Sequence, residues 1–389
     1  MGKTVAFLYN DEFQEYDFSP THPLKPIRLK LTYELLKDYG VFGSSQVKVI
    51  PGRLATDGEL MLVHAPEYIG AVKKISETGS EPSYAYAFGI GPGDNPAFKG
   101  MHEASSLIAG CSIVAIDEVM NKKAEHAVSI SGGLHHALRD KASGFCVYND
   151  PAIAIAYATK KYDVRVAYID IDAHHGDGVQ WAFYNRADVL TISLHESGQF
   201  LFPGTGFIDE VGIGKGEGFS VNVPLEPGTY DDLYLSAFNS IVPPIVRAFK
   251  PDLIVSQNGC DTHYTDPLAE LSLTTNAYEK LYAAIHNLAH EICNGRLVAL
   301  GGGGYQAYQV VPRAWSLLSA DLAEINLNNF VPESWQKLCS EKAHTKCPDS
   351  LRDRETAPTA FAESIEDKTA HIIVSVKQKV FPYYGLPTR

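Results

Sequence analysis

One stretch of the chain decides the fold: RVAYIDIDAHHGDG, residues 165–178. Its first half is a continuous apolar run that ends at Asp170, the pattern of a parallel strand buried on both faces. Its second half is crowded with acids and histidines. In open parallel sheets, ligands bind beyond the carboxyl ends of the strands. The stretch therefore predicts a buried strand whose carboxyl end carries a functional site.

Similar short apolar runs recur along the chain, separated by stretches with helical periodicity. We expect strands at 5–9, 127–130, 165–170, 188–194, 252–257 and 296–300. Apolar residues at helical spacing predict a helix over 276–294, with Thr275 as its N-cap and Gly295 just beyond its end. A second helix over 231–249 should kink or break at Pro243-Pro244. This alternation predicts an α/β fold, doubly wound or barrel, in one domain.

Composition limits the classes of function. The 389 residues are 45% hydrophobic, which suits a globular core, and 33 basic against 46 acidic residues give a net charge of −13, which disfavours a nucleic-acid partner. The N-terminus does not resemble a signal peptide, and no apolar run approaches the ~20 residues that cross a bilayer. No C-x-x-C pair occurs among the cysteines, so we expect a reducing, cytoplasmic protein whose metal, if any, is held by histidine and carboxylates. The cysteines are Cys111, Cys146, Cys260, Cys293, Cys339 and Cys347.

The acids and histidines after residue 170 suggest a metal site. Residues two apart in an extended chain point the same way, so Asp172 and His174 share a face. A remote carboxylate such as Asp261, which follows the expected strand 252–257, would complete three ligands and leave one position open, the catalytic pattern. The donor set suits zinc, and also Fe(II) or Co(II). The alternative is an Asp-x-Asp turn without a metal.

The adjacent pair His135-His136 follows the expected strand 127–130. Near a metal site, such a pair is suited to act as general base and general acid. Asp170 and Asp177 could each bind one imidazole and fix its tautomer. The alternative is two turn histidines with no catalytic role.

A run of four glycines, Gly301–Gly304, precedes Tyr305. No Lys-Ser or Lys-Thr follows, which argues against a phosphate-binding loop. The glycines instead let the backbone bring Tyr305 close to a bound group, where its hydroxyl could donate to a developing oxyanion. The alternative is a core aromatic.

Two further features are interpreted as surface. His286 and His290 lie four apart on the expected helix 276–294, and without a third ligand we assign them to a solvated face. The polar stretch 332–367, with Cys339 and Cys347, is also assigned to the surface.

Taken together, these motifs resemble a known family. They are Leu134-His135-His136-Ala137, Ser143-Gly144-Phe145-Cys146, residues 170–178, Phe202-Pro203-Gly204-Thr205-Gly206, Gly259-Cys260-Asp261 and Gly301–Tyr305. Over about residues 4–320 the chain is similar to the zinc-dependent histone deacetylase superfamily, in its class I branch and more narrowly the bacterial acetoin-utilisation proteins. The resemblance implies the arginase–deacetylase fold, a single mainly parallel sheet sandwiched between helices. It implies one deacetylase domain over 1–389, with residues 321–389 as a helical and loop extension.

The resemblance also implies roles for individual residues. The zinc ligands would be Asp172, His174 and Asp261, the catalytic residues His135, His136, Tyr305, Asp170 and Asp177. The acyl-lysine tunnel would use Gly144, Phe145, Phe202 and Leu268, with Asp94 at the rim. A K⁺ or Na⁺ site would use Asp170, Asp172, His174, Ser193 and Leu194, and Arg28 would lie near an internal acetate pocket.

The implied activity is hydrolysis of the acetyl amide on lysine ε-amines of a protein or peptide, acetyl-CoA synthetase being one candidate, in control of acetoin or acetate metabolism. Two departures affect specificity: the rim loop at 90–93, and His263-Tyr264 after Asp261, which would narrow the tunnel mouth. The alternatives are an acetylpolyamine deacetylase, a non-catalytic acetyl-lysine binder and a binuclear manganese ureohydrolase.

Overall fold

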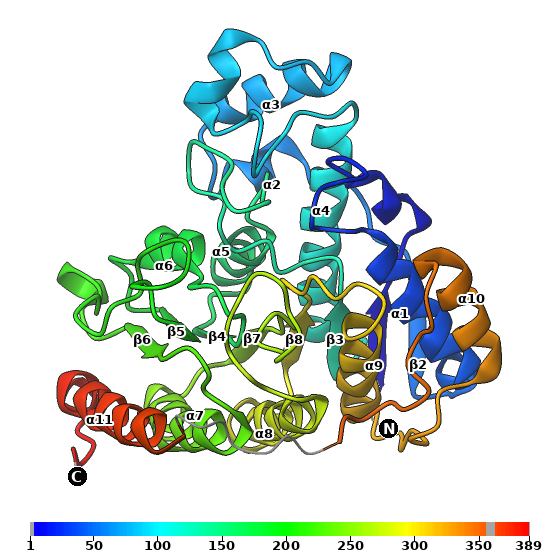
Figure 1. Ribbon diagram of the computed structural model, residues 1–389. Helices are drawn as coiled ribbons and strands as arrows, with labels where there is room; N and C mark the ends of the chain where they lie inside the picture. The colour runs from blue at the N-terminus through cyan, green and yellow to red at the C-terminus, as the bar shows by residue number, and fades with distance from the viewer. Residues whose placement is uncertain (1–3, 355–361, 389) are drawn as a thin grey trace.

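The computed structural model describes residues 4–354 and 362–388, and its centre is an eight-stranded sheet (Figure 1). The strand order is β2-β1-β3-β8-β7-β4-β5-β6, and each neighbouring pair is parallel. The strands are β1 (Val5–Leu8), β2 (Val47–Ile50), β3 (His126–Ser129), β4 (Val166–Asp170), β5 (Val189–Glu196), β6 (Ser220–Leu225), β7 (Leu253–Gln257) and β8 (Leu297–Leu300). The expected parallel α/β architecture is confirmed.

Helices cover both faces of this sheet. One layer contains α4 (Met101–Met120), α5 (Asp150–Tyr162) and α6 (Asp177–Phe183). Figure 1 shows the other layer as a row of helices: α11 (Ala362–Val380), α7 (Asp231–Phe249), α8 (Thr275–Cys293), α9 (Val311–Leu322) and α1 (Ile27–Asp38). The short α2 (Asp57–Leu60) and α3 (Pro66–Thr78) lie apart from this row. Parallel strands enclosed in this way are buried on both faces, which explains their continuous apolar runs.

The register of the sheet brings together the loops that carry the candidate site residues. Asp170, the last residue of β4, pairs with Gln257 at the end of β7 and with Ser193 in β5. Ser129 and Leu300, at the ends of β3 and β8, pair with each other. Because β3, β8, β7 and β4 are neighbours in space, the four loops that follow them converge at one edge.

All six expected strands are present, with bounds shifted by at most two residues. The two strands that were not expected, β2 and β6, are the two edges of the sheet. Both carry polar residues or proline inside their runs (VKVI and SVNVPL), so neither gives the continuous apolar pattern.

Two details of the helices differ from expectation. α7 continues through Pro243 and Pro244 without a break, because its apolar face is fully buried and that packing offsets the lost backbone hydrogen bonds. α8 begins one residue earlier than expected, and Thr274 is its N-cap, accepting from the Asn276 amide at 3.2 Å.

The C-terminal part is less superficial than expected. In α10 (Glu333–Ala343), Trp335 is fully buried and donates its indole N–H to the Leu31 carbonyl at 2.8 Å. Cys339 and Cys347 are buried and joined by a disulfide. The surface assignment of 332–367 is therefore wrong for these three side chains, of which Trp335 joins α10 to α1, while residues 355–361 lie outside the described part.

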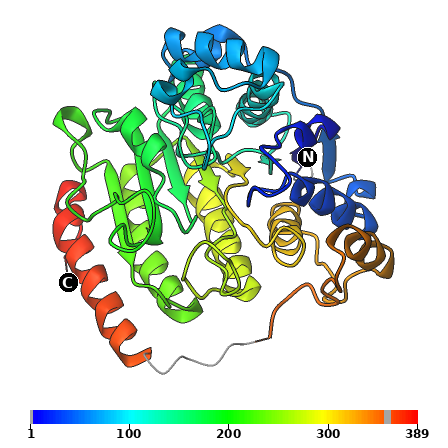
Figure 2. The ribbon, with the colours of Figure 1, turned by 45° about the horizontal axis from the view of Figure 1, so that its top comes forward.

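Beyond that gap, Figure 2 shows α11 extended beside α7 at the β6 edge of the molecule. None of the helices in the described ranges has the length and apolar character that crossing a membrane requires.

Candidate metal centre and active site

Three expected metal ligands converge at the carboxyl edge of the sheet. Ligand atoms of Asp172, His174 and Asp261 all lie within 4.8 Å of one another, and the three residues are buried. His174 Nδ1 lies 3.2 Å from Asp172 Oδ1 and 3.0 Å from Asp261 Oδ2. Two come from the loop after β4 and one from the loop after β7, neighbouring strands whose ends share this edge.

Neighbouring groups fix the carboxylate oxygens. Asp172 Oδ2 accepts from the Gln257 side-chain amide at 2.7 Å and from the Gly303 backbone at 2.8 Å. Asp261 Oδ1 accepts from the Ala173 backbone at 2.8 Å. Such support orients ligands before any ion arrives.

The cluster fits a divalent cation. Two carboxylates and one imidazole are a donor set for zinc, Fe(II) or Co(II). The backbone leaves room for it: a Cβ at Gly259 would come within 2.1 Å of Asp172 Oδ2, and one at Gly303 within 2.0 Å of Asp261 Oδ2. Glycines at both positions are therefore needed for the carboxylates to approach each other.

The electrostatics of the cluster also call for a cation. Burial raises the pKa of Asp261 to about 6, and repulsion from Asp172 adds to that rise. Burial alone would lower the pKa of His174, but its bonds to Asp172 and Asp261 prevail and raise that pKa well above the usual value. Buried carboxylates in contact are costly unless a positive charge lies between them.

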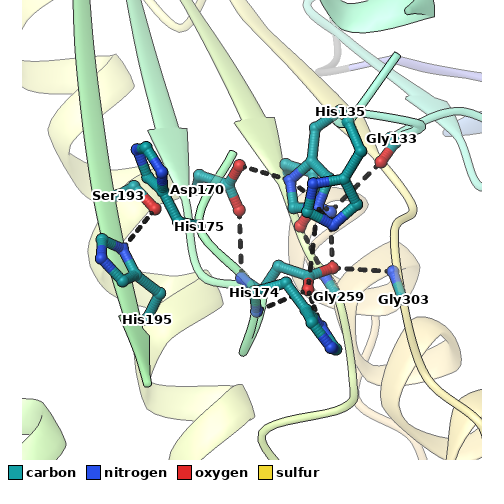
Figure 3. Close-up of polar contacts among 12 residues, drawn as sticks. Gly133, His135, Asp170, His174, His175, Ser193, His195, Gly259 and Gly303 are labelled. Carbon is teal, nitrogen blue, oxygen red and sulfur yellow. Dashed lines mark hydrogen bonds and ion pairs between the residues drawn. The ribbon is translucent and has the colours of Figure 1, made fainter. Parts of the chain in front are cut away.

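The histidine pair lies beside this cluster, each ring tied to its own carboxylate (Figure 3 shows His135 and Asp170). His135 Nδ1 donates to Asp170 at 2.8 Å, and His136 Nδ1 donates to Asp177 at 2.7 Å. A carboxylate only accepts, so these bonds place a proton on each Nδ1 and turn each Nε2 toward the site. The two Nε2 atoms are 3.0 Å apart.

The two imidazoles differ electrostatically. Burial lowers the pKa of His136 to about 4, helped by repulsion from His135. Burial also disfavours charge on His135, but Asp170 and Asp172 outweigh it and raise its pKa to about 9. One ring therefore tends to stay neutral and the other to hold a proton, which suits a base beside an acid.

Tyr305 approaches the cluster as expected. Its ring lies 6.4 Å from the His174 ring, centroid to centroid, and its backbone N–H donates to Asp266 at 2.9 Å. The glycines before it include Gly302 and Gly304, both with positive φ and both close to neighbouring side chains, Gln257 and Val311 respectively. A side chain at either position would push the segment away from the site.

Four expected tunnel and rim residues lie around this cluster. Phe202, 43% exposed, has its ring 5.0 Å from His136, and the Phe145 ring lies 5.7 Å from Tyr305. A Cβ on Gly144 would come within 2.5 Å of His136 and 2.9 Å of Phe202, so only glycine lets the backbone pack this closely against the two rings. Asp94 and Gly144 both line an open depression of about 620 Å³.

Leu268 is half-buried, and its backbone N–H donates to Asp266 at 2.9 Å. Its place in the tunnel wall stays a prediction.

The residues expected to bind a monovalent cation lie at the end of β4, in the loop after it and in the neighbouring β5. The Asp172 backbone donates to Asp170 at 3.1 Å, and Ser193 pairs with Asp170 across the sheet (Figure 3). The Leu194 carbonyl already accepts from the Tyr234 hydroxyl at 3.1 Å. Occupation by K⁺ or Na⁺ stays a prediction.

Arg28 is buried at the base of the site. It donates to the Gly304 carbonyl at 3.0 Å and stacks over Trp315 at 5.0 Å. It lines a small cavity of about 20 Å³ together with His135, His136 and Tyr305. An internal pocket next to Arg28 is therefore present, and acetate as its occupant stays a prediction.

Two expectations about other histidines are wrong. His263 does not narrow the tunnel mouth, because its ring is buried and bonds Asp353 at 2.8 Å and Thr265 at 2.9 Å; for Tyr264, which is 46% exposed, the narrowing stays a prediction. His286 is not on a solvated face: it is only 6% exposed, and a third histidine, His126, lies 3.1 Å from it.

Sequence reasoning missed two residues that support the site. Gln257 bonds Asp172 and also accepts from the Gly259 backbone at 2.8 Å. Asp150 accepts from the Gly133 and Leu134 backbones at 3.0 and 2.8 Å and so shapes the loop before the histidine pair. Gln257 could have been found from the sequence, because it is a polar residue at the end of a mostly apolar strand. Asp150 begins a helix, where an aspartate is common and indicates no link to the site.

Comparisons with known proteins agree with this geometry. A histone deacetylase domain model matches residues 22–322. The acetoin utilization protein AcuC of Bacillus subtilis (strain 168) is 46% identical over 349 residues, 90% of this chain and 89% of that protein. AcuC of Staphylococcus xylosus is 43% identical over 336 residues, 86% of this chain and 87% of that protein.

Solved structures give the same result for the fold. The crystal structure of an HDAC homologue from Aquifex aeolicus matches with a TM-score of 0.83 and 32% identity, covering 94% of this chain and 100% of that one. An HDAC homologue complexed with SAHA matches with a TM-score of 0.83 and 31% identity, covering 95% and 100%. The single parallel sheet between helices is thus the arginase–deacetylase fold, and the chain belongs to the histone deacetylase family.

Proposed function

We propose that this deacetylase is a metal-dependent amidohydrolase that removes acetyl groups from lysine ε-amines of proteins. The observation that carries the proposal is the convergence of Asp172, His174 and Asp261 beside two histidines, each bonded to its own aspartate. Family membership supports the deacetylase reaction; the lysine substrate, the zinc ion and the cytoplasmic location belong to the proposal.

Asp172, His174 and Asp261 would hold the ion. A metal bound there supplies Lewis-acid polarisation of the substrate carbonyl and a lowered pKa for the attacking water. The remaining chemistry falls to the chain's own side chains.

His136 is placed to accept a proton at Nε2, because its Nδ1 proton is held by Asp177. The Asp177 carboxylate stabilises the imidazolium that forms. His135, linked to His136 through their Nε2 atoms, can pass a proton to the departing amine. Tyr305 would donate its hydroxyl proton toward the oxyanion of the tetrahedral intermediate.

The aromatic residues near the cluster support a linear substrate stem. Phe202 lies against His136 and Phe145 against Tyr305, so both rings flank the approach to the histidines. Methylene groups of an acyl-lysine would be desolvated between such rings, and a branched stem would clash with them.

The test compares three substrates: an acetyl-lysine peptide, acetylated acetyl-CoA synthetase and an acetylpolyamine. We expect release of acetate from the lysine substrates with a kcat/KM above that for the polyamine, and release from Asp261→Asn that is slower by roughly 10³–10⁴. Preference for the polyamine would favour the alternative small-molecule deacetylase. Binding of the peptide without acetate release would favour the non-catalytic binder.

A further inference from the structure

A second cluster of possible ligands lies at the opposite, amino edge of the sheet. Ligand atoms of His126, His286 and His290 all lie within 4.8 Å of one another. His286 Nε2 is 3.1 Å from His126 Nε2 and 2.9 Å from His290 Nε2. Three imidazoles thus turn the same ring nitrogen toward one point.

The topology explains this meeting. His126 is the first residue of β3 and pairs with Leu297, the first residue of β8. α8 leads into β8 through Asn294 and Gly295, so its last turns lie at the same edge as the start of β3. His286 and His290 are four residues apart and share one face of α8, which carries them to His126.

Carboxylates lie behind two of the three rings. His286 Nδ1 lies 3.1 Å from Asp321 at the end of α9, and His290 Nδ1 lies 3.5 Å from Glu125. Because a carboxylate only accepts, the bond to Asp321 places a proton on His286 Nδ1, and His286 Nε2 then presents a lone pair toward the other two rings. Carboxylate–imidazole pairs of this kind support metal-bound histidines in general.

Two imidazole nitrogens that face each other at 2.9 Å must have a proton or a metal ion between them. If His286 Nε2 carries a proton, its single N–H can donate to only one of the two neighbouring imidazoles. A metal ion at the common point can instead accept a lone pair from each of the three rings. Zinc bonds nitrogen at about 2.0–2.1 Å, which at tetrahedral angles sets ligand nitrogens about 3.3 Å apart. The observed separations of 3.1 and 2.9 Å are close to that value.

The cluster is enclosed but has a route to solvent. His126 is 0% exposed and His286 6%, while the His290 side chain is 26% exposed. His286, His290 and Asp321 line a surface pocket of about 540 Å³. Gly295 leaves the space open, since a Cβ there would come within 3.0 Å of the His290 ring.

We propose that His126, His286 and His290 form a second transition-metal site, separate from the catalytic cluster, that binds Zn²⁺ or another imidazole-preferring divalent ion. The four residues of β3 alone separate the amino edge from the carboxyl edge by about 10 Å, three steps of ~3.3 Å, and the two sites share no ligand. The ion would tie the start of β3 to the last turns of α8.

The first test counts metal in the full-length holoenzyme after equilibration with Zn²⁺ and removal of free ion. His290→Gln should bind one equivalent less than wild type and keep its deacetylase rate. His371→Gln, at an exposed histidine of α11, is the matched control and should bind as wild type does. Equal metal content in wild type and His290→Gln would overturn the proposal.

The second test uses the wild-type protein and so does not depend on the folding of a variant. Cu²⁺ added to the wild-type holoenzyme should give an electron paramagnetic resonance spectrum with coupling to three imidazole nitrogens. The catalytic cluster offers one imidazole, so the nitrogen count separates the two sites. A spectrum with one coupled nitrogen, or none, would show that the three histidines bind no metal and share a proton instead.

Discussion

The two edges of the sheet hold histidine clusters of opposite design. At the carboxyl edge, carboxylates are themselves among the converging ligands, and the nearby His135 and His136 are free of that role. At the amino edge, imidazoles alone converge, and the carboxylates of Asp321 and Glu125 stand behind them.

This contrast is the reason that we propose catalysis at one cluster and not at the other. Beside its ligands the carboxyl edge has the proposed base and acid, His136 and His135, and two aromatic residues, Phe145 and Phe202. The amino edge joins a strand start to helix ends and has no histidine pair beside its ligands among the described residues. We therefore expect the two clusters to have different roles. Variants at the carboxyl edge should change the deacetylase rate, and variants at the amino edge should change the stabilisation of the fold by a metal ion.

Asp261→Asn should have the largest effect. Loss of a charged ligand weakens metal binding at the carboxyl edge, and losing several kcal/mol of Lewis-acid stabilisation corresponds to roughly 10³–10⁴ in rate. Metal analysis should show one ion lost while the amino-edge ion remains. Asp209→Asn, at an exposed aspartate that pairs with Lys379, is the control. Full metal and full rate in Asp261→Asn would remove Asp261 from the ligand set.

His136→Ala should separate proton transfer from metal binding. A positioned general base contributes about 10²–10⁴ in rate, so we expect kcat to fall by about 10³ with both ions retained. Steady-state kinetics and metal analysis on one preparation make the measurement. A near-normal kcat would transfer the base role to His135.

Tyr305→Phe should have a smaller effect, confined to the chemical step. The change removes one hydroxyl and keeps the ring that packs against Phe145. A donor to an oxyanion contributes more in the transition state than in the ground state, so kcat should fall by about 10²–10³ with little change in KM. An unchanged kcat would make Tyr305 a packing residue only.

Part of the carboxyl edge could be predicted from the sequence because four of its residues are local, and the remote Asp261, His135 and Tyr305 also follow recognisable strands. Asp170, Asp172, His174 and Asp177 fall within eight positions at a strand end, where period-two geometry assigns their faces. The interior strands were equally visible, since burial on both faces leaves a continuous apolar run. Edge strands β2 and β6 escape that rule because polar residues interrupt them.

The amino edge could not be predicted, because its third member is remote. His286 and His290 gave the helical spacing, but His126 lies 160 residues from His286 and reaches it only through the pairing of β3 with β8. Likewise, the direction of the His263 side chain depends on Asp353, 90 residues further on. Strand order and helix placement had to be known before either contact could be seen.

The smallest expected effect is on stability at the amino edge. An ion that binds only the folded state at a hundred times its Kd adds about 2.7 kcal/mol, which for a chain of this length raises Tm by about 3 °C. The Zn²⁺-induced rise in Tm should therefore be about 3 °C smaller in His290→Gln than in wild type, measured by calorimetry at equal free zinc. His371→Gln should match wild type, and the deacetylase rate of His290→Gln should change less than about twofold, because the ion lies at the edge opposite the chemistry. An equal rise in all three proteins would mean that zinc stabilises only the carboxyl edge, and the three histidines would then be held by a shared proton and by packing.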